Sequence, residues 1–111
     1  MIYKIFRSPE WEELQRNGHS AGAPIDVADG FVHFSTAGQL AGTLGKHFAG
    51  VSGLWLAALD EAGLSESLKW EVSRGGALFP HLYRRLALAD ILWCREIPLT
   101  EAGHLLPDDL A

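Results

Sequence analysis

The sequence predicts a small α+β domain with about five strands and with two helices in its N-terminal half. The chain has 111 residues and is 48% hydrophobic, which suits one folded domain with a continuous core. Apolar runs of strand length recur along the chain, and the connections mix helices with plain loops, which disfavours a doubly wound parallel sheet. We expect residues 1–99 to form a single domain and residues 100–111 to form a peripheral tail.

The N-terminal part predicts a strand, a helix and a long loop. Residues 2–6 form the first predicted strand. Ser8 is the expected N-cap of a helix whose first position is a proline and which ends at Gly18. The segment 19–30 contains glycines and a proline, and we expect it to be a loop over one edge of a cleft.

A second helix is predicted directly after a second strand. The strand covers residues 31–35, and Ser35 or Thr36 caps a helix over residues 37–48. Residues 60–64 are expected to form a short turn or helical connection. Three further strands are predicted at residues 54–59, 68–73 and 91–97.

The charge and cysteine content narrow the function classes. Fourteen acidic and nine basic residues give a formal charge of −5, so an extended nucleic-acid surface is not expected. The single cysteine, Cys94, excludes an internal disulfide and fits the cytoplasm. No apolar run approaches the length of a membrane span. One local anion site remains open, built from Arg74, Arg84 and Arg85.

The segment 29–36 places polar residues in an apolar strand, where core packing alone would not require them. Successive side chains of a strand point to opposite faces, so Val32 and Phe34 are expected to face the core. His33 and Ser35 then share the other face, with about 6.6 Å between their Cα atoms. That spacing suits two groups that bind one small ligand.

Each polar residue of this segment has a functional and a structural interpretation. His33 could orient a ligand or act as a general base, since its ordinary pKa lies near neutrality, or it is a structural histidine. Ser35 and Thr36 cap the following helix, yet the N-terminus of that helix is also an anion site.

A second polar cluster follows further along the chain. Leu68, Trp70 and Val72 alternate as one predicted buried face, which leaves Glu71 and Ser73 on the other. Glu71 is either a general base or acceptor for a sugar hydroxyl, or a solvated carboxylate of the strand.

A glycine turn at residues 75–76 then returns the chain toward the sheet. Arg74 precedes this turn and could bind a phosphate through two parallel hydrogen bonds, or it is an ordinary surface arginine. His81 follows a proline and could meet His33 across a cleft, or it is a loop histidine. Tyr83 closes the segment.

The two segments supply all the candidate site residues. The five histidines lack metal-ligand spacing, so no metal is expected. The candidate catalytic residues are His33, Glu71 and His81. The candidate ligand-binding residues are Ser35, Thr36, Ser73, Arg74 and Tyr83.

Four runs of residues occur in a recognisable order. They are Ile-Tyr-Lys-Ile, Asp-Gly-Phe-Val-His-Phe-Ser-Thr, Leu-Lys-Trp-Glu and Gly-Gly-Ala-Leu-Phe-Pro-His-Leu-Tyr. Together they resemble an uncharacterised bacterial family, domain of unknown function 952 (DUF952). The resemblance covers residues 2–99, which is nearly the whole chain.

A more distant likeness suggests a chemistry. The run Phe-Val-His-Phe-Ser at residues 31–35 is similar to the His-Val-His-Leu-Ser run of the RNA 2′-phosphotransferases. Those enzymes have an ADP-ribosyltransferase-type fold and use NAD to remove a 2′-phosphate from RNA. The resemblance implies a small, split and strongly twisted sheet with an NAD-sized cleft, in which His33 and Ser35 match the second-strand motif. NAD is the implied cofactor, and a small-molecule nucleotide is the implied partner.

The first strand departs from that pattern. Transferases of this type carry a histidine motif there, whereas this chain reads Tyr-Lys-Ile-Phe at residues 3–6. Two interpretations therefore stand. One is an NAD-dependent enzyme of ADP-ribosyl or 2′-phospho transfer, and the other is a non-catalytic ligand-sensing or protein-interaction module that retains the cleft.

Overall fold

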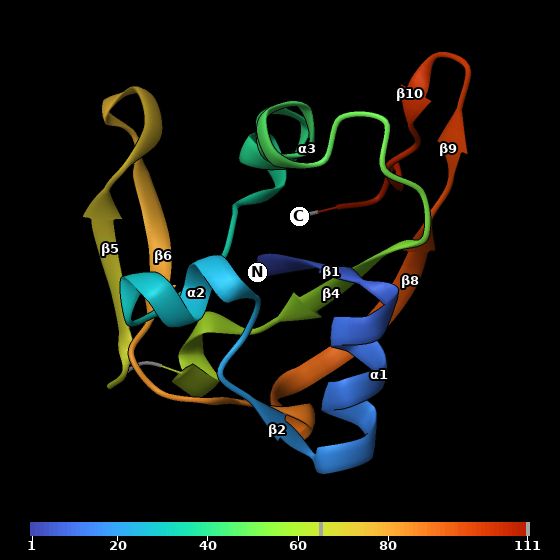
Figure 1. The fold of residues 1–111 in the computed structure, drawn as a ribbon. Helices are drawn as coiled ribbons and strands as arrows, with labels where there is room; N and C mark the ends of the chain where they lie inside the picture. The colour runs from blue at the N-terminus through green and yellow to red at the C-terminus, as the bar shows by residue number, and fades with distance from the viewer. Residues whose placement is uncertain (65, 111) are drawn as a thin grey trace.

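Two three-stranded antiparallel sheets frame the molecule (Figure 1). The computed structural model describes residues 1–64 and 66–110, and the side chain of Arg74 lies outside the described part. An isolated bridge joins the two sheets: the Tyr3 N–H donates to the Ser35 carbonyl at 2.8 Å, and the Ser35 N–H donates to the Tyr3 carbonyl at 2.9 Å. The two sheets are thus linked to each other through the backbones of β1 and Ser35.

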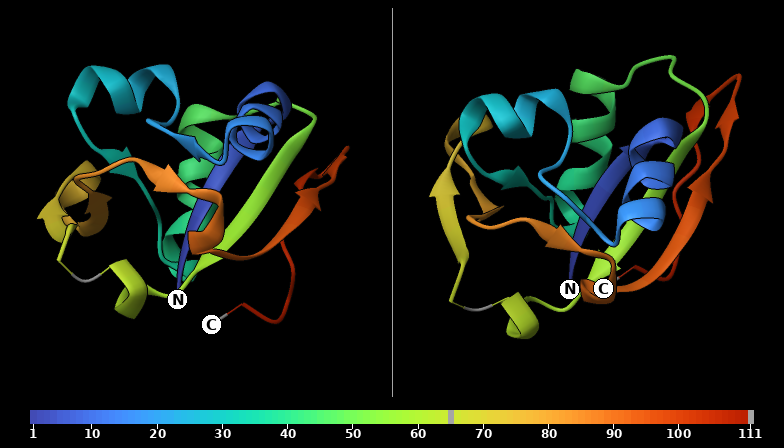
Figure 2. Two further views of the ribbon diagram at one scale, coloured as in Figure 1. Left: turned by 90° about the horizontal axis from the view of Figure 1, so that it is seen from below. Right: turned by 60° about the horizontal axis from the view of Figure 1, so that its bottom comes forward.

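The strands are paired as follows. The first sheet has the order β1 (Ile2–Arg7), β4 (Leu54–Leu59) and β8 (Ile91–Ile97). The second has the order β3 (Val32–His33), β6 (Leu78–Leu82) and β5 (Leu68–Val72). Two short ladders pair β2 (His19–Ser20) with β7 (Leu86–Ala87), and β9 (Leu99–Thr100) with β10 (Gly103–His104). The β5–β6 hairpin lies at the opposite side of the molecule from β8 (Figures 1 and 2).

Three α-helices lie in the N-terminal half: α1 (Ser8–Asn17), α2 (Pro24–Asp29) and α3 (Leu40–His47). Short 3₁₀ turns occupy Ala37–Gln39, Glu61–Leu64, Arg74–Gly76 and Leu88–Asp90. The predicted α+β class is confirmed, and the predicted helix at 37–48 appears as a 3₁₀ turn followed by α3. Within the described residues, none of the helices is both long and apolar enough to cross a membrane.

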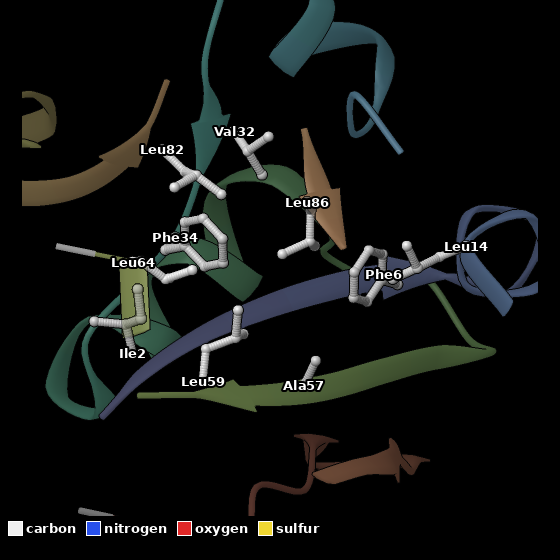
Figure 3. Packing of buried hydrophobic residues seen from close by; sticks show 10 residues of the cluster. All are labelled: Ile2, Phe6, Leu14, Val32, Phe34, Ala57, Leu59, Leu64, Leu82 and Leu86. Atoms are coloured by element: carbon white, nitrogen blue, oxygen red, sulfur yellow. The ribbon is translucent and has the colours of Figure 1, made fainter. Parts of the chain in front are cut away.

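The hydrophobic core lies on both faces of the first sheet. One cluster includes Ile2 and Phe6 of β1 with Ala57 and Leu59 of β4, and Figure 3 shows these side chains directed toward Val32, Leu82 and Leu86. The second cluster occupies the opposite face and contains the alternate residues of the same strands, with α3 packed on it. Burial on both faces explains why β4 reads as a continuous apolar run. The residues of the second cluster include Tyr3, Ile5, Leu40, Leu44, Leu54, Leu56 and Ala58.

The C-terminal segment contacts this second cluster. Leu106 and Leu110 pack against it, and His104 Nε2 lies 2.7 Å from the Val51 carbonyl. Arg95 reaches Asp109 at 3.2 Å. These contacts tie residues 100–110 to the first sheet.

Helix α1 ends as predicted but begins differently. Gly18 adopts the left-handed conformation (φ 79°), and its N–H donates to the Leu14 carbonyl at 2.8 Å. The predicted N-cap role of Ser8 is wrong, because the extended residue before the helix is Arg7, whose N–H donates to Glu10 Oε1 at 3.0 Å. The Ser8 hydroxyl instead donates to the Gly53 carbonyl at 2.7 Å and ties α1 to the start of β4.

Two exposed glycines form a matched test of these backbone assignments. Gly18→Ala is expected to lower the free energy of unfolding by about 1–2 kcal/mol, because an L side chain is strained at positive φ. Gly45→Ala, inside α3 with open space at the Cβ position, is expected to raise it by about 0.4–1 kcal/mol. Urea unfolding of both variants measures the difference, and the same sign for both would contradict the assignment.

The loop predicted at residues 19–30 is wrong. That segment forms β2 and then α2, which starts at Pro24 and ends at a left-handed Gly30. The carboxylate of Asp26 accepts the N–H of Ala23 at 2.7 Å and caps the helix. Pro24 and Gly30, which mark the two ends of this helix, are typical residues for those positions. A six-residue helix is, however, too short to show apolar periodicity in the sequence.

Strand β6 was not among the predicted strands, although it is the central strand of the second sheet. Pro80 sits in the middle of it, and proline is usually confined to edge strands because it has no N–H to donate. Here the Pro80 carbonyl accepts the Phe34 N–H at 3.0 Å, so the chain still pairs on the acceptor side.

The predicted burial of Trp70 and Val72 is also wrong. Their side chains are 39% and 70% exposed, while Leu68 packs against the core as expected. This face of the β5–β6 hairpin lies open near its turn, since Leu78 of β6, the register partner of Val72, is 51% exposed as well.

Candidate functional site

The two polar segments meet at the centre of the second sheet. His33 of β3 is the register partner of His81 of β6, and their ring centroids lie 5.4 Å apart. The ring of Phe31 stacks on His81 at 4.1 Å and contacts His33 at 4.6 Å. The convergence of the two histidines, which the sequence left open, is therefore observed.

A cavity of about 480 Å³ opens beside this pair, within the range of about 300–1,000 Å³ for small-molecule sites. It lies between β1, the first turn of α2, α3 and β6. Aromatic and aliphatic groups form much of its wall, chiefly Ile5, Phe34, Phe48 and Phe79. Its polar residues include Lys4, Arg7, Asp26, His33, Thr43, Ser73 and His81.

The carboxylate of Asp26 is the centre of the polar network. Its Oδ2 accepts from Lys4 Nζ at 2.8 Å as well as from the Ala23 N–H, and its Oδ1 lies 2.6 Å from His33 Nδ1. Oδ1 also accepts the backbone N–H of His33 at 3.0 Å. The Asp26 side chain has no exposed surface, and Lys4 keeps 7%, so this is a buried ion pair.

Sequence reasoning did not identify Lys4 or Asp26. Lys4 lies two residues from both Ile2 and Phe6 in β1, so its side chain shares their face of the strand, which carries a core cluster. That lysine in an apolar strand was the available signal, because a buried cation requires a partner. Asp26 stood two residues after Pro24, in a segment predicted to be a loop.

The environment of Asp26 lowers its pKa to about 2. Burial acts in the opposite direction, but the hydrogen bond from His33 and the positive charge of Lys4 outweigh it. The carboxyl therefore stays ionised in the folded protein under conditions that protonate an ordinary aspartate.

This lowered pKa predicts an acid-dependent loss of stability. The folded pKa lies below the unfolded value of 3.8, so the stabilisation is present above about pH 4 and is lost as the pH falls toward about 2. We expect Asp26 to account for about 2 kcal/mol of that loss. Urea unfolding across this pH range, for the native chain and for Asp26→Asn, isolates the contribution, because the variant lacks the titrating group. Equal acid sensitivity of the two proteins would contradict it.

His33 faces carboxylates with both ring nitrogens. Nδ1 contacts Asp26, and Nε2 lies 3.0 Å from Asp29 Oδ2. A neutral imidazole carries one N–H donor, so only the imidazolium can donate to both carboxylates at once. This arrangement makes His33 a hydrogen-bond donor in a network that links β1, α2 and β3.

The two ring nitrogens of His81 differ in their contacts, unlike those of His33. Its ring is 4% exposed, and Nδ1 lies 2.9 Å from Glu71 Oε1. Its Nε2 is buried and has no hydrogen-bond partner within the part of the chain that the structure describes. Because buried polar atoms are nearly always satisfied, an unpartnered nitrogen in the wall of a cavity is a specific sign of a missing partner.

Glu71 receives a second hydrogen bond from the Tyr83 hydroxyl at 2.6 Å. This bond, together with the one from His81, lowers the pKa of Glu71 and keeps it ionised. The same contact raises the pKa of Tyr83. Glu71 therefore accepts from Tyr83 and from His81, which fixes its position beside the cavity.

The other predicted ligand-binding residues are divided. Ser73 lines the cavity. Ser35 is buried and its Oγ lies 2.9 Å from Thr43 Oγ1, while the Thr36 N–H donates to Gln39 Oε1 at the start of the 3₁₀ turn. These contacts give Ser35 and Thr36 structural roles. The side chain of Arg74 lies outside the described residues.

The open question of a local anion site is partly answered. Arg84 forms two hydrogen bonds with the carboxylate of Asp90, at 2.9 and 3.1 Å, and Arg85 Nη1 lies 3.2 Å from His19 Nδ1. The Arg84 guanidinium therefore forms an ion pair with Asp90 within the protein. Both arginines border a smaller hollow of about 230 Å³ on the Tyr83 side of the second sheet. In the described part of the chain, no three His, Cys, Asp or Glu residues are grouped so as to hold a metal.

The fold and the site together define a small α+β protein whose two sheets enclose a cavity with paired histidines. Residues 5–94 match the model of the protein family of unknown function DUF952, and the chain belongs to that family. The expected membership is therefore confirmed.

Solved structures of one relative resemble the whole chain. The crystal structure of protein CC0527 from Caulobacter crescentus is 42% identical, with a TM-score of 0.88, and the match covers 93% of this chain and 90% of that one. The solution NMR structure of the same protein is 42% identical, with a TM-score of 0.83 and coverage of 93% and 89%. No curated protein matches the chain.

Proposed function

We propose that the cavity binds a small-molecule nucleotide of the NAD or ADP-ribose type. The observation that carries this proposal is His81, which lines a cavity of about 480 Å³ and whose buried Nε2 has no partner among the described residues. A ribose hydroxyl fits that nitrogen, because it is a neutral donor that can enter a site with aromatic walls.

The remaining wall suits the other parts of such a ligand. The side chains of Phe34 and Phe79 line the cavity and suit packing against a planar base, whereas the ring of Phe48 is already covered by the Arg7 guanidinium at 4.6 Å. The cations Lys4 and Arg7 are already balanced by Asp26 and Glu10, at 2.8 and 3.8 Å. The phosphate contact that the sequence predicts for Arg74 is kept in this proposal as a sequence-based assignment, because its side chain lies outside the described residues.

The proposed reaction, if the protein is an enzyme, is ADP-ribosyl or 2′-phospho transfer, as the distant resemblance implies. When bound, NAD would supply the ADP-ribosyl group in the first reaction, with nicotinamide as the leaving group, and its ADP-ribose part would accept the phosphate from the RNA in the second. His81 would hold a ribose or acceptor hydroxyl, Glu71 would keep His81 in place, and His33 would donate to the ligand from its network with Asp26.

One observation favours the alternative, a non-catalytic ligand-binding module. Both nitrogens of His33 already contact carboxylates, so His33 must give up the contact with Asp29 before it serves a ligand. The Asp29 side chain is 46% exposed, so a ligand can displace it from His33. One experiment therefore distinguishes the transferase from the non-catalytic module.

That test combines binding with turnover. Ligand-observed NMR with NAD, ADP-ribose, nicotinamide and a 2′-phosphorylated nucleotide is expected to show binding of at least one nucleotide, lost in a folded His81→Phe variant. Release of nicotinamide from NAD would support the transferase, whereas binding without release would support the module. Absence of binding by all four compounds would overturn the nucleotide proposal.

A further inference from the structure

We infer that His81 selects its ligand as a hydrogen-bond acceptor at Nε2, and that Glu71 and Tyr83 are the positioning residues that impose this form. The ligand half of this inference rests on the proposed function. The state of the His81 ring does not, since it is a property of the protein alone.

The donor and acceptor roles around Glu71 determine the tautomer of His81. Oε1 lies 2.6 Å from the Tyr83 hydroxyl and 2.9 Å from His81 Nδ1. An ionised carboxylate has no proton to give, so both partners must donate to it. The proton of a neutral His81 ring then resides on Nδ1, and the buried Nε2 of this cavity-lining residue carries the lone pair.

The surroundings of the ring hold this orientation. Phe31 stacks on one face at 4.1 Å with an angle of 24° between the ring planes. The charged neighbours are Lys69 on β5, whose Nζ lies 4.9 Å from the centre of the Tyr83 ring, and His33 on β3, whose Nδ1 is paired with Asp26. Glu71 is the group that contacts His81 itself, so the tautomer follows from Glu71.

A lone pair at Nε2 defines the chemical class of group that can bind there. A hydroxyl or N–H group of the ligand can donate to it, whereas a phosphate oxygen would meet another acceptor. The ribose hydroxyls are therefore expected at His81, and the phosphates at a separate part of the cavity. His81 becomes a determinant of specificity for hydroxyl-bearing ligands.

The ring state is measured first, in the ligand-free protein. Long-range ¹H–¹⁵N NMR spectra at neutral pH are expected to show His81 protonated at Nδ1 and unprotonated at Nε2. Glu71→Leu should shift the ring toward the other tautomer, and Glu71→Gln should restore the native pattern, because the amide oxygen still accepts. Tyr83→Phe tests the second donor to Glu71 and should weaken the preference. An Nε2–H tautomer or a doubly protonated ring in the native protein would overturn the inference.

A pair of nucleosides then tests ligand selection without phosphates. Adenosine is expected to bind about five- to tenfold more tightly than 2′,3′-dideoxyadenosine, which lacks the 2′- and 3′-hydroxyl donors. The difference should vanish in His81→Phe, which keeps an aromatic ring against Phe31. Equal affinities in the native protein, or a difference that survives in His81→Phe, would overturn the selection role. If neither nucleoside nor any nucleotide binds, the proposed function and the ligand half both fail, while the NMR measurement still decides the ring state.

Discussion

Asp26→Ala is expected to lower the free energy of unfolding by about 3–5 kcal/mol, the cost of removing one partner of a buried ion pair. The substitution leaves the Lys4 ammonium with 7% exposure and no counter-ion at the Asp26 position. It also removes the acceptor of the Ala23 and His33 N–H groups, and each unsatisfied buried donor adds to the loss. The effect should therefore exceed that of an ordinary surface substitution several-fold.

Urea unfolding measures this loss, and Asp29→Ala is the matched control. Asp29 contacts the same His33 ring from the other side, but its side chain is 46% exposed. A surface ion pair contributes at most about 1 kcal/mol, so the control should remain close to the native protein. A loss below about 1 kcal/mol for Asp26→Ala would show that the network does not hold β1 against α2.

Lys4→Met is expected to cost about 3 kcal/mol, slightly less than the loss of Asp26. Methionine fills the same buried space on β1, but the carboxylate of Asp26 loses the ammonium at 2.8 Å and keeps His33. The pKa of Asp26 should then rise from about 2 toward its unfolded value of 3.8. Because stability changes with pH only when those two values differ, the acid-dependent loss should shrink in this variant.

One measurement separates this effect from a simple packing defect. It is the slope of the unfolding free energy against pH below about pH 4, which should flatten in Lys4→Met and stay steep in Lys46→Met. Lys46 is exposed at the end of α3, so its replacement should change stability by at most about 1 kcal/mol. A steep slope that survives in Lys4→Met would assign the acid sensitivity to other carboxylates.

The sequence predicted the elements whose signals are local and long enough to read. Strands β4 and β8 occupy the predicted residues, because their apolar runs extend over six and seven positions. Helix α2 and strand β6 escaped, because one is short and the other contains a proline that argues against a central strand. The exposure of Trp70 and Val72 on β5 could not be predicted, because whether other elements cover a face of a hairpin is a tertiary property.

The residues of the candidate site also differ in how strongly the local sequence marks them. His33, Glu71 and His81 stand out in the sequence because they are polar residues in or beside apolar strands, and the structure brings His33 and Glu71 next to His81. Lys4 and Asp26 are 22 positions apart, and their contact depends on how α2 packs on β1, which no local signal encodes. Thr36 occupies the N-cap position that the sequence offered to Ser35 or Thr36, because residues between a strand and a helix commonly serve the helix start, whereas Ser35 contacts Thr43.

A titration of the ¹⁵N-labelled protein with ADP-ribose, followed by NMR, tests most directly whether the cavity is a nucleotide site. We expect the amide shifts to concentrate on the residues that line the cavity, with Phe34, Phe79 and His81 among the largest, and His81→Phe to abolish them. Shifts gathered on a different face of the protein, or no shifts at concentrations that saturate ordinary nucleotide sites, would contradict the claim that this cavity is a nucleotide site.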